Sequence, residues 1–255
     1  MRSPMQYLRG VRHPEGYHGR GRTKAFFEGW YIKLVSSDRS TRWAVIPGIF
    51  RGDGSAGSVD EAFIQVLDGL SGRSWYFPFA ADEFSADEGR LAVTIGGNRF
   101  DQSGVMLDLP IISGSLWYAT AIDPYPVTLR APGIMGWYGY LPVMECFHGI
   151  VSFGHDLAGT LTIEDRLVEF TGGRGYIEKD WGTAFPSSYV WLASNHLSDA
   201  SGGDIAGSLV ASCAVIPGVG RTFRGSIVAL KYPHSLATWA TWNGSRDTEF
   251  VIDDA

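Results

Sequence analysis

Cysteine, basic charge and long apolar runs are all scarce in this chain, and each scarcity excludes a class of protein. Only two cysteines occur, Cys146 and Cys213, so neither a disulfide scaffold nor a CxxC zinc or redox site is supported. We expect both to be small buried apolar residues. The net charge of −6 offers no basic footprint for nucleic acid, so no nucleic-acid partner is expected.

No apolar stretch approaches the roughly 20 residues that a membrane-spanning helix needs. The first residues, MRSPMQYLRGVRHPEGYHG, contain no apolar run of the kind that marks a secretory signal. These two absences predict a soluble cytoplasmic protein. Residues 131–145 leave open a peripheral contact with a lipid surface, although the acidic net charge gives such a contact no electrostatic help.

Motifs for cofactors and nucleophilic catalysis are missing too. The 33 glycines form neither a GxxxxGK[ST] loop nor a strand-linked GxGxxG, so nucleotide binding is unsupported. No GxSxG surrounds a serine. His148, His155 and His196 do not have the spacing of metal ligands, so neither a metal nor another cofactor is predicted.

A helical period of apolar residues is absent from every long stretch, whereas the alternation typical of strands recurs. Residues 26–35, 42–50 and 61–69 alternate in this way, and glycine or aspartate then punctuates the chain about every 8–12 residues. This pattern predicts an all-β, antiparallel sandwich or barrel. Residues 131–150, rich in glycine and aromatic residues, break this rhythm and form either a packed connection or an apolar lid. One short helix could lie within residues 131–145.

The pentapeptide AVIPG occurs twice, at residues 44–48 and 214–218, each time after a tryptophan-bearing strand. Trp30 lies 14 residues before the first copy and Trp191 lies 23 before the second. We interpret the recurrence as a duplication that yields two related β units. The predicted division is an N-terminal arm at 1–25, a first unit at 26–170 and a shorter second unit at 171–255, which could be incomplete at its carboxyl end.

Chemistry-bearing side chains are concentrated in residues 172–197, GGRGYIEKDWGTAFPSSYVWLASNHL, which read as two strands joined by a Phe-Pro-Ser-Ser turn. Alternate residues of a strand point to opposite faces, so the even-numbered residues from 176 to 180 should share one face. The odd-numbered residues from 177 to 181 should share the other. So many ionisable groups in a β core indicate a functional site or a paired network.

Four segments resemble the tocopherol cyclase family: EGWYIK at 28–33, MECFHGIVSFGHDLAGTL at 144–161, GYIEKDWG at 175–182 and FPSSYVWLASNH at 185–196. They follow the order and spacing of that family and cover most of residues 26–240. The resemblance implies a calycin-like pair of lipocalin-type antiparallel β units, related in fold to carotenoid hydratases and some fungal cyclases. It also implies a hydrophobic prenylated substrate.

Tocopherol cyclases close a chroman ring by protonating a prenyl double bond, after which the phenol oxygen captures the tertiary cation. This chemistry needs a protonated carboxylic acid in an apolar pocket, aromatic faces for the cation and polar groups for the phenol. By resemblance, the catalytic candidates are Asp180, Glu178 and His196. The substrate-binding candidates are Glu28, Trp30, Tyr31, Tyr176, Lys179, Trp181, Trp191, Asn195 and His155.

Structural alternatives stay open for several of these residues. Glu178 and Asp180 could belong to a solvated or salt-bridged strand edge. Glu28 could be a buried structural carboxylate bonded to backbone, and His196 a core histidine. The chain could also be a lipid-binding protein that uses its cavity without chemistry, or an isoprenoid hydratase in which water replaces the phenol.

Overall fold

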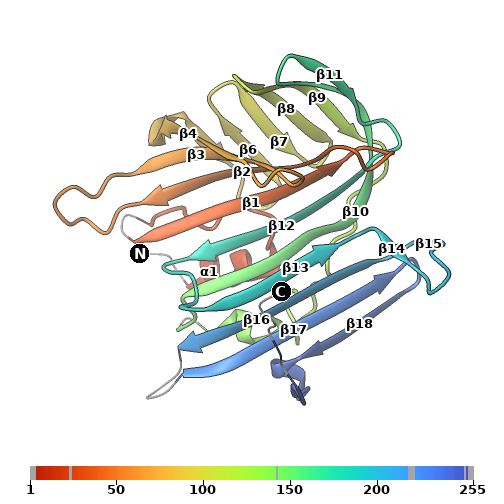
Figure 1. Cartoon of the computed structure of the whole chain (residues 1–255). Coiled ribbons are helices and arrows are strands. Elements are labelled where there is room, and N and C mark those ends of the chain that lie inside the picture. The colour runs from red at the N-terminus through yellow and green to blue at the C-terminus, as the bar shows by residue number, and fades with distance from the viewer. Residues whose placement is uncertain (1–3, 23–24, 142, 218–221, 250, 252–255) are drawn as a thin grey trace.

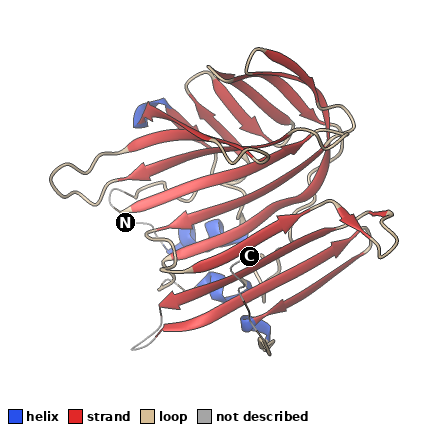
Figure 2. Cartoon of the chain, in the orientation of Figure 1, coloured by secondary structure: helices blue, strands red, loops and turns tan. Residues whose placement is uncertain are grey.

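The computed structural model describes residues 4–22, 25–141, 143–217, 222–249 and 251, and these fold into antiparallel β-sheets with little helix (Figures 1 and 2). The all-β, antiparallel prediction is confirmed. The helical elements are α1 (Pro4–Arg12) and three 3-10 turns, η1 (Ala81–Glu83), η2 (Gly136–Tyr140) and η3 (Thr241–Asn243). Among the described residues, no helix combines the length and apolar character that crossing a membrane requires.

Twelve strands of the described chain form one large sheet, in the order β4-β3-β2-β1-β12-β10-β9-β8-β7-β6-β5, with β11 paired to β10. Strand β1 has the bounds that its alternation predicts. The strands are β1 (Phe26–Val35), β2 (Arg42–Arg51), β3 (Glu61–Asp68), β4 (Ser74–Ala80), β5 (Phe84–Ala86), β6 (Ala92–Ile95), β7 (Asn98–Asp101), β8 (Gly104–Leu109), β9 (Ile112–Tyr118), β10 (Cys146–Ile163), β11 (Arg166–Glu169) and β12 (Arg174–Gly182).

A second sheet of four strands has the order β13-β16-β17-β18, and a two-stranded hairpin, β14-β15, lies at its end (Figure 1). These strands are β13 (Tyr189–Ser194), β14 (Leu197–Ser198), β15 (Asp204–Ile205), β16 (Ser208–Pro217), β17 (Thr222–Tyr232) and β18 (Ser235–Ala240). The short helix expected within 131–145 is present as η2.

The large sheet curls around one apolar core, to which the middle of β1 contributes alternate residues (Figure 1). Trp30, Ile32 and Leu34 have 0% exposure and pack with apolar residues from both halves of the sheet, such as Ile64 and Phe100. Burial of this face fixes the register of β1, since a slip of one residue would turn every apolar side chain outward. A second core lies between β10, β12 and the smaller sheet.

The predicted hairpin across residues 172–197 does not form. Strand β12 lies between β1 and β10 in the large sheet, whereas β13 pairs with β16 in the small one. Both edges of β12 are therefore already hydrogen-bonded, so β13 cannot pair with it. The Phe-Pro-Ser-Ser segment at 185–188 instead carries the chain from one sheet to the other.

The large sheet also continues across the predicted unit boundary at residue 171, because β12 joins strands from the first unit. A division of the chain there remains a prediction. The two AVIPG copies lie on β2 and β16, each beside a tryptophan-bearing strand, but in different registers. Ala44 is opposite Lys33, three residues after Trp30, and Ala214 is opposite Tyr189, two residues before Trp191. Gly218, the last residue of the second copy, lies outside the described residues.

The N-terminal arm is part of the core, which the sequence did not predict. Helix α1 was missed because its nine residues include Gly10 and its first turn contains no acidic residue, although Ser3, Pro4 and Gln6 give the sequence pattern of a helix start. Beyond it, the indole Nε1 of Trp30 donates to the Glu15 carbonyl at 3.0 Å, and the Tyr17 amide donates to the Asp87 carbonyl at 2.7 Å. His18 is only 2% exposed.

A buried charged network ties this arm to β1 and β12. Lys179 forms an ion pair with Glu28, and both side chains have zero exposure. The His18 amide donates to both Glu28 oxygens at 2.9 Å, and the Lys179 ammonium approaches His18 Nδ1 at 2.8 Å. Burial and the Lys179 charge lower the pKa of His18 to about 4, so the imidazole is neutral. Each charge therefore has a partner, as burial demands.

Replacing Lys179 by methionine should lower the free energy of unfolding by about 3–5 kcal/mol, because the Glu28 carboxylate would remain buried without its ammonium. The matched control is the double variant Glu28→Gln/Lys179→Met, which removes both charges and should recover most of that loss. Urea denaturation of the three proteins measures the difference. An exposed ion pair contributes at most about 1 kcal/mol. If the free energy of unfolding of Lys179→Met lay within that amount of the parent value, a buried, mutually dependent pair would be contradicted.

Candidate active site

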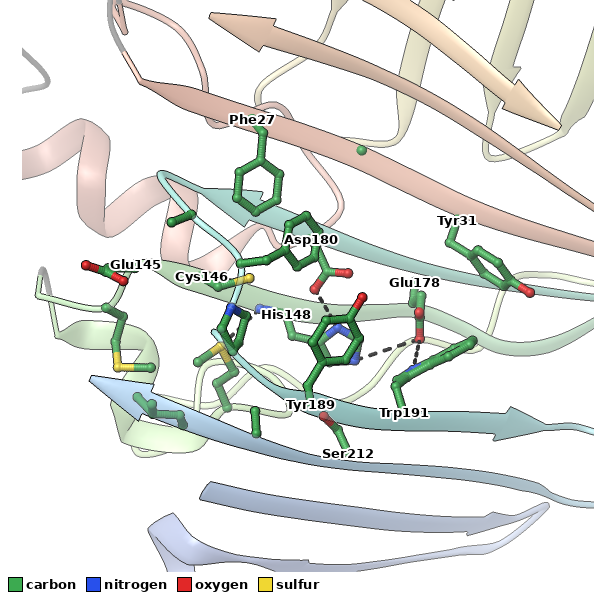
Figure 3. Close-up of a pocket in the computed structure, with 18 of the residues that line it drawn as sticks. Phe27, Tyr31, Glu145, Cys146, His148, Glu178, Asp180, Tyr189, Trp191 and Ser212 are labelled. Atoms are coloured by element: carbon green, nitrogen blue, oxygen red, sulfur yellow. Dashed lines mark hydrogen bonds and ion pairs between the residues drawn. The ribbon is translucent and has the colours of Figure 1, made fainter. Parts of the chain in front are cut away.

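A cavity of about 440 Å³ lies between the large sheet and the small one (Figure 3). Phe27 and Tyr31 line it from β1, and Tyr189 and Trp191 line it from β13. The segment 131–150 contributes Met135, Tyr138 and Met144 to the lining, and its role as a lid stays a prediction. Most of the wall is apolar and aromatic, as in sites for small organic ligands.

Strand pairing brings three ionisable side chains onto the cavity face. His148 of β10 lies opposite Asp180 of β12, and Glu178 is two residues along β12 on the same face. In Figure 3 these three side chains point into the same space, with Trp191 approaching from the smaller sheet. The predicted orientation of Glu178 and Asp180 on one face is confirmed. The solvated strand edge is excluded for Glu178, which is 4% exposed.

The acid cluster, His148, Glu178 and Asp180, is held by defined hydrogen bonds. His148 Nδ1 lies 2.9 Å from Asp180 Oδ1, and its Nε2 lies 3.8 Å from Glu178 Oε2. The same Glu178 oxygen accepts from the Tyr176 hydroxyl at 2.6 Å and from Trp191 Nε1 at 3.1 Å. Glu178 Oε2 is thus fixed by two donors, and the imidazole is hydrogen-bonded to Asp180 and lies within ion-pair distance of Glu178.

The net effect of burial and neighbouring charges is to raise the pKa values of Glu178 and His148. Burial, together with the nearby Asp180 carboxylate, raises the pKa of Glu178 to about 7, although His148 and two hydrogen bonds act in the other direction. Burial alone would lower the pKa of His148, but Asp180 and Glu178 outweigh it and raise the value to about 9. Near pH 7 the imidazole is therefore protonated, and Glu178 exchanges its proton readily.

The acid cluster also contains the donor types of a divalent-cation site, with one ligand atom from each residue within 4.8 Å of the others. Histidine spacing alone did not indicate this combination, because two of its three members are carboxylates. Glu178 Oε2 already has two donors and His148 Nδ1 is bonded to Asp180, whereas His148 Nε2 is buried without a hydrogen-bond partner among the described residues. The arrangement fits an acid–base cluster without a metal, and the absence of a metal stays a prediction.

Several predicted site residues lie on the opposite face of the large sheet. Alternation places Lys179 and Trp181 away from Glu178, and pairing with β1 places Trp30 directly beside Lys179. The Lys179 ammonium is 4.5 Å from the centre of the Trp30 ring and 4.9 Å from that of Trp181. None of the three lines the cavity. Glu28, by contrast, is among the residues that line the cavity, but its carboxylate is bonded to Lys179 and the His18 amide in the buried network, in agreement with its interpretation as a structural carboxylate.

His155, Asn195 and His196 also lie away from the cavity lining, nearer the Arg174 end of β12. His155 Nδ1 is 2.9 Å from the Ser152 hydroxyl, and Asn195 Nδ2 donates to the Gly175 carbonyl at 2.8 Å. Burial and nearby cations lower the pKa of His196 to about 4, so its imidazole is neutral. The structure therefore does not bring His196 to the acid cluster.

Of the predicted site residues, Glu178, Asp180, Tyr31, Tyr176 and Trp191 are brought together. Sequence reasoning missed His148, which completes the acid cluster, and Cys146 and Tyr189, which line the cavity. A signal for His148 was present, since it lies in the MECFHG segment on which the family resemblance rests. Without the pairing of β10 with β12, nothing connected it to Asp180, 32 residues away.

The fold is shared with solved structures of low sequence identity. A putative AttH from Nitrosomonas europaea matches with a TM-score of 0.55 and 9% identity, over 88% of this chain and 70% of that one. CghA matches with a TM-score of 0.55 and 15% identity, over 83% of this chain and 59% of that one. CghA was also crystallised with Sch210972, and that structure gives a TM-score of 0.54. These likenesses show the fold alone.

Sequence similarity is more specific. A probable chloroplastic tocopherol cyclase of Oryza sativa subsp. japonica is 25% identical over 95% of this chain, which spans 62% of the length of that relative. The chloroplastic tocopherol cyclase of Zea mays is 25% identical over 43% of this chain and 23% of its own length. The profile of the family described as tocopherol cyclase-like matches residues 122–249, half of the chain, including β10, β12 and β13. The chain therefore belongs to the tocopherol cyclase-like family.

Proposed function

We propose that this protein is a cofactor-independent cyclase that isomerises a prenylated phenol or quinol by protonating its double bond. The observation that carries the proposal is the acid cluster itself: a buried carboxyl group with a pKa raised to about 7, beside a second carboxylate and an imidazole, in an apolar aromatic cavity. Family membership and the similarity to plant tocopherol cyclases support the same class of reaction.

Glu178 is the proton donor in this proposal. Its Oε2 accepts hydrogen bonds from Tyr176 and Trp191, so the proton is carried on Oε1. Transfer of that proton to the less substituted alkene carbon leaves a tertiary cation on the other carbon. The phenol oxygen then forms a C–O bond to the cation and loses its own proton to the Asp180 carboxylate. The product is an isomer of the substrate.

His148 positions the proton acceptor. Its Nδ1 is hydrogen-bonded to Asp180 Oδ1, and Asp180 and Glu178 raise the pKa of His148 to about 9, so a positive charge lies beside the Asp180 carboxylate that accepts the phenol proton. After product formation Asp180 releases that proton to solvent, and Glu178 takes up a proton from solvent, which restores the starting state.

Two aromatic rings next to Glu178 can stabilise the tertiary carbocation. Trp191 and Tyr31 meet edge to face with ring centres 5.3 Å apart, and both line the cavity. An aromatic face stabilises a nearby cation by about 0.5–2 kcal/mol, and more strongly where water is excluded. Tyr31 stays neutral during the reaction, because burial and Glu178 raise its pKa to about 12.

Glu178→Gln should reduce cyclisation by about 10²–10⁴-fold, the range of a lost general acid, while ligand binding changes little because the amide preserves the shape of the side chain. The assay is conversion of a prenylated quinol into an isomer of unchanged mass, with binding followed by calorimetry. Glu164→Gln, an exposed carboxyl far from the cavity, is the matched control. Full activity in Glu178→Gln would remove the proton donor from the proposal, and loss of activity on chelation in the parent would point to a metal instead.

The pH dependence of kcat/KM should fall above about pH 7, since Glu178 must carry a proton to act and its folded-state pKa is about 7. His148→Gln should move this limb to higher pH, because the imidazolium charge lowers the Glu178 pKa and its removal leaves burial and Asp180 unopposed. Rates at each pH in both proteins measure the shift. A rate that rises through pH 7 would instead assign Glu178 a role as base.

A lipid-binding protein without catalysis is the second candidate, because the cavity is largely apolar and suits an isoprenoid. Incubation with a panel of prenylated quinols separates the cases by mass spectrometry. An isomer supports the cyclase, a gain of one water supports a hydratase, and tight binding without either product supports the carrier.

A further inference from the structure

Gly29 faces the cavity from the middle of β1, directly opposite Asp180 of β12 and Gly48 of β2. The backbone does not require glycine there, since its φ lies outside the left-handed region. Crowding does not require it either, because a Cβ at this position would meet no atom closer than 3.6 Å, an ordinary van der Waals contact. What glycine provides is the missing side chain, which leaves open space beside the acid cluster.

The neighbouring Gly48 differs from Gly29 in this respect. A Cβ there would lie 2.3 Å from Cζ of Phe63 and 2.7 Å from the Glu28 carbonyl oxygen. Glycine at 48 is therefore needed for close packing, because the Phe63 ring lies over it. Close packing therefore explains the glycine at position 48 but not the one at position 29.

The space over Gly29 leads to three stacked rings. Phe63 of β3 lies between Phe50 of β2 and Tyr76 of β4, with ring centres 4.8 Å and 5.4 Å apart. All three line the same cavity as the acid cluster, and Phe50 and Tyr76 are 41% and 47% exposed. We call these three rings the aromatic stack. Four strand spacings separate β12 from β4, so the cavity extends roughly 19 Å across the sheet.

We propose that the aromatic stack is a subsite for the apolar chain of an elongated ligand, and that Gly29 keeps this subsite connected to the acid cluster. The ligand class is an amphiphile whose oxygen-bearing ring lies at Glu178 and Asp180 and whose flexible hydrocarbon chain passes over Gly29 onto the rings. The assignment of the ring as the end that reacts rests on the proposed function. Binding of the hydrocarbon chain at the aromatic stack does not depend on that function.

The chemistry of the two ends fits this orientation. The acid cluster offers donors and acceptors that a phenol can use, whereas the stack presents half-exposed aromatic surface, which is stabilised when an apolar chain covers it. Ile46, which would face the same chain from β2, is apolar, and the lining residue Gln65 on β3 is uncharged. A carboxylate recurs only at the outer end of the stack, where Glu61 of β3 accepts from the Tyr76 hydroxyl at 2.5 Å, so among the described lining residues the path over Gly29 to Phe63 is without charge.

Calorimetric titration with 4-alkylphenols tests the subsite without depending on catalysis, since their saturated chains cannot be cyclised. In the parent protein, affinity should rise with chain length by up to about threefold for each added methylene until the stack is covered. Gly29→Leu should abolish this rise and weaken binding of the longest phenols at least tenfold. Gly29→Ala, whose added carbon fits without a clash, should give an intermediate slope.

Thr94→Leu, an equally apolar change on an exposed position of β6, is the control and should follow the parent. Thermal melts show whether each variant is folded. The proposal is overturned if the parent shows no chain-length dependence, or if folded Gly29→Ala and Gly29→Leu keep the parent slope. Chain-length-dependent binding without turnover of prenylated quinols would support the subsite and reject the proposed cyclase activity. Turnover without chain-length-dependent binding would support the cyclase activity and reject the subsite.

Discussion

The alternation of β12 between two differently buried faces is the constraint on which the rest of this structure depends. One face places Glu178 and Asp180 in the cavity, and the other places Lys179 against Glu28 in the core. Pairing with β1 on one edge and β10 on the other holds β12 in a single register. A slip of one residue would turn Glu178 and Asp180 away from the cavity and turn Lys179 toward it, so the site and the buried ion pair are specified by the same backbone hydrogen bonds.

The two faces solve the problem of buried charge in different ways. Around Lys179, every charge has a close opposite partner, so no charge is left buried and unpaired, and the network ties the N-terminal arm to β1 and β12. Around Glu178, two carboxyl groups share one imidazole, so the charges are not fully balanced and a proton remains exchangeable near neutral pH. Incomplete compensation is tolerable in the cavity because a functional site gains from a mobile proton.

The smaller sheet completes the site rather than merely enlarging the molecule. Trp191 donates to Glu178 from β13, and Tyr189 lines the same cavity. The connection at 185–188, which the sequence suggested as a hairpin turn, places β13 across from β12 instead of beside it. In a hairpin, β13 would lie beside β12 in the large sheet. Because β13 belongs to the smaller sheet instead, the Trp191 indole can face the Glu178 carboxyl group across the cavity.

Much of the fold could be predicted from the sequence because strand periodicity is a local property. The bounds of β1, the antiparallel class and the common face of Glu178 and Asp180 follow from alternation and turn residues. The same rule already placed Trp181 on the other face, although its aromatic character suggested a cavity wall. Helix α1 was missed because a short segment with a glycine gives little local signal.

The sequence by itself determined which side chains of β12 share a face, since a strand projects alternate residues to opposite sides whatever surrounds it. Only the tertiary structure decided which face became the cavity and which partners reached it. His148 and Trp191 come to Glu178 from separate strands, and Gly29 lies opposite Asp180, because long-range pairing and sheet packing select neighbours that no local pattern encodes.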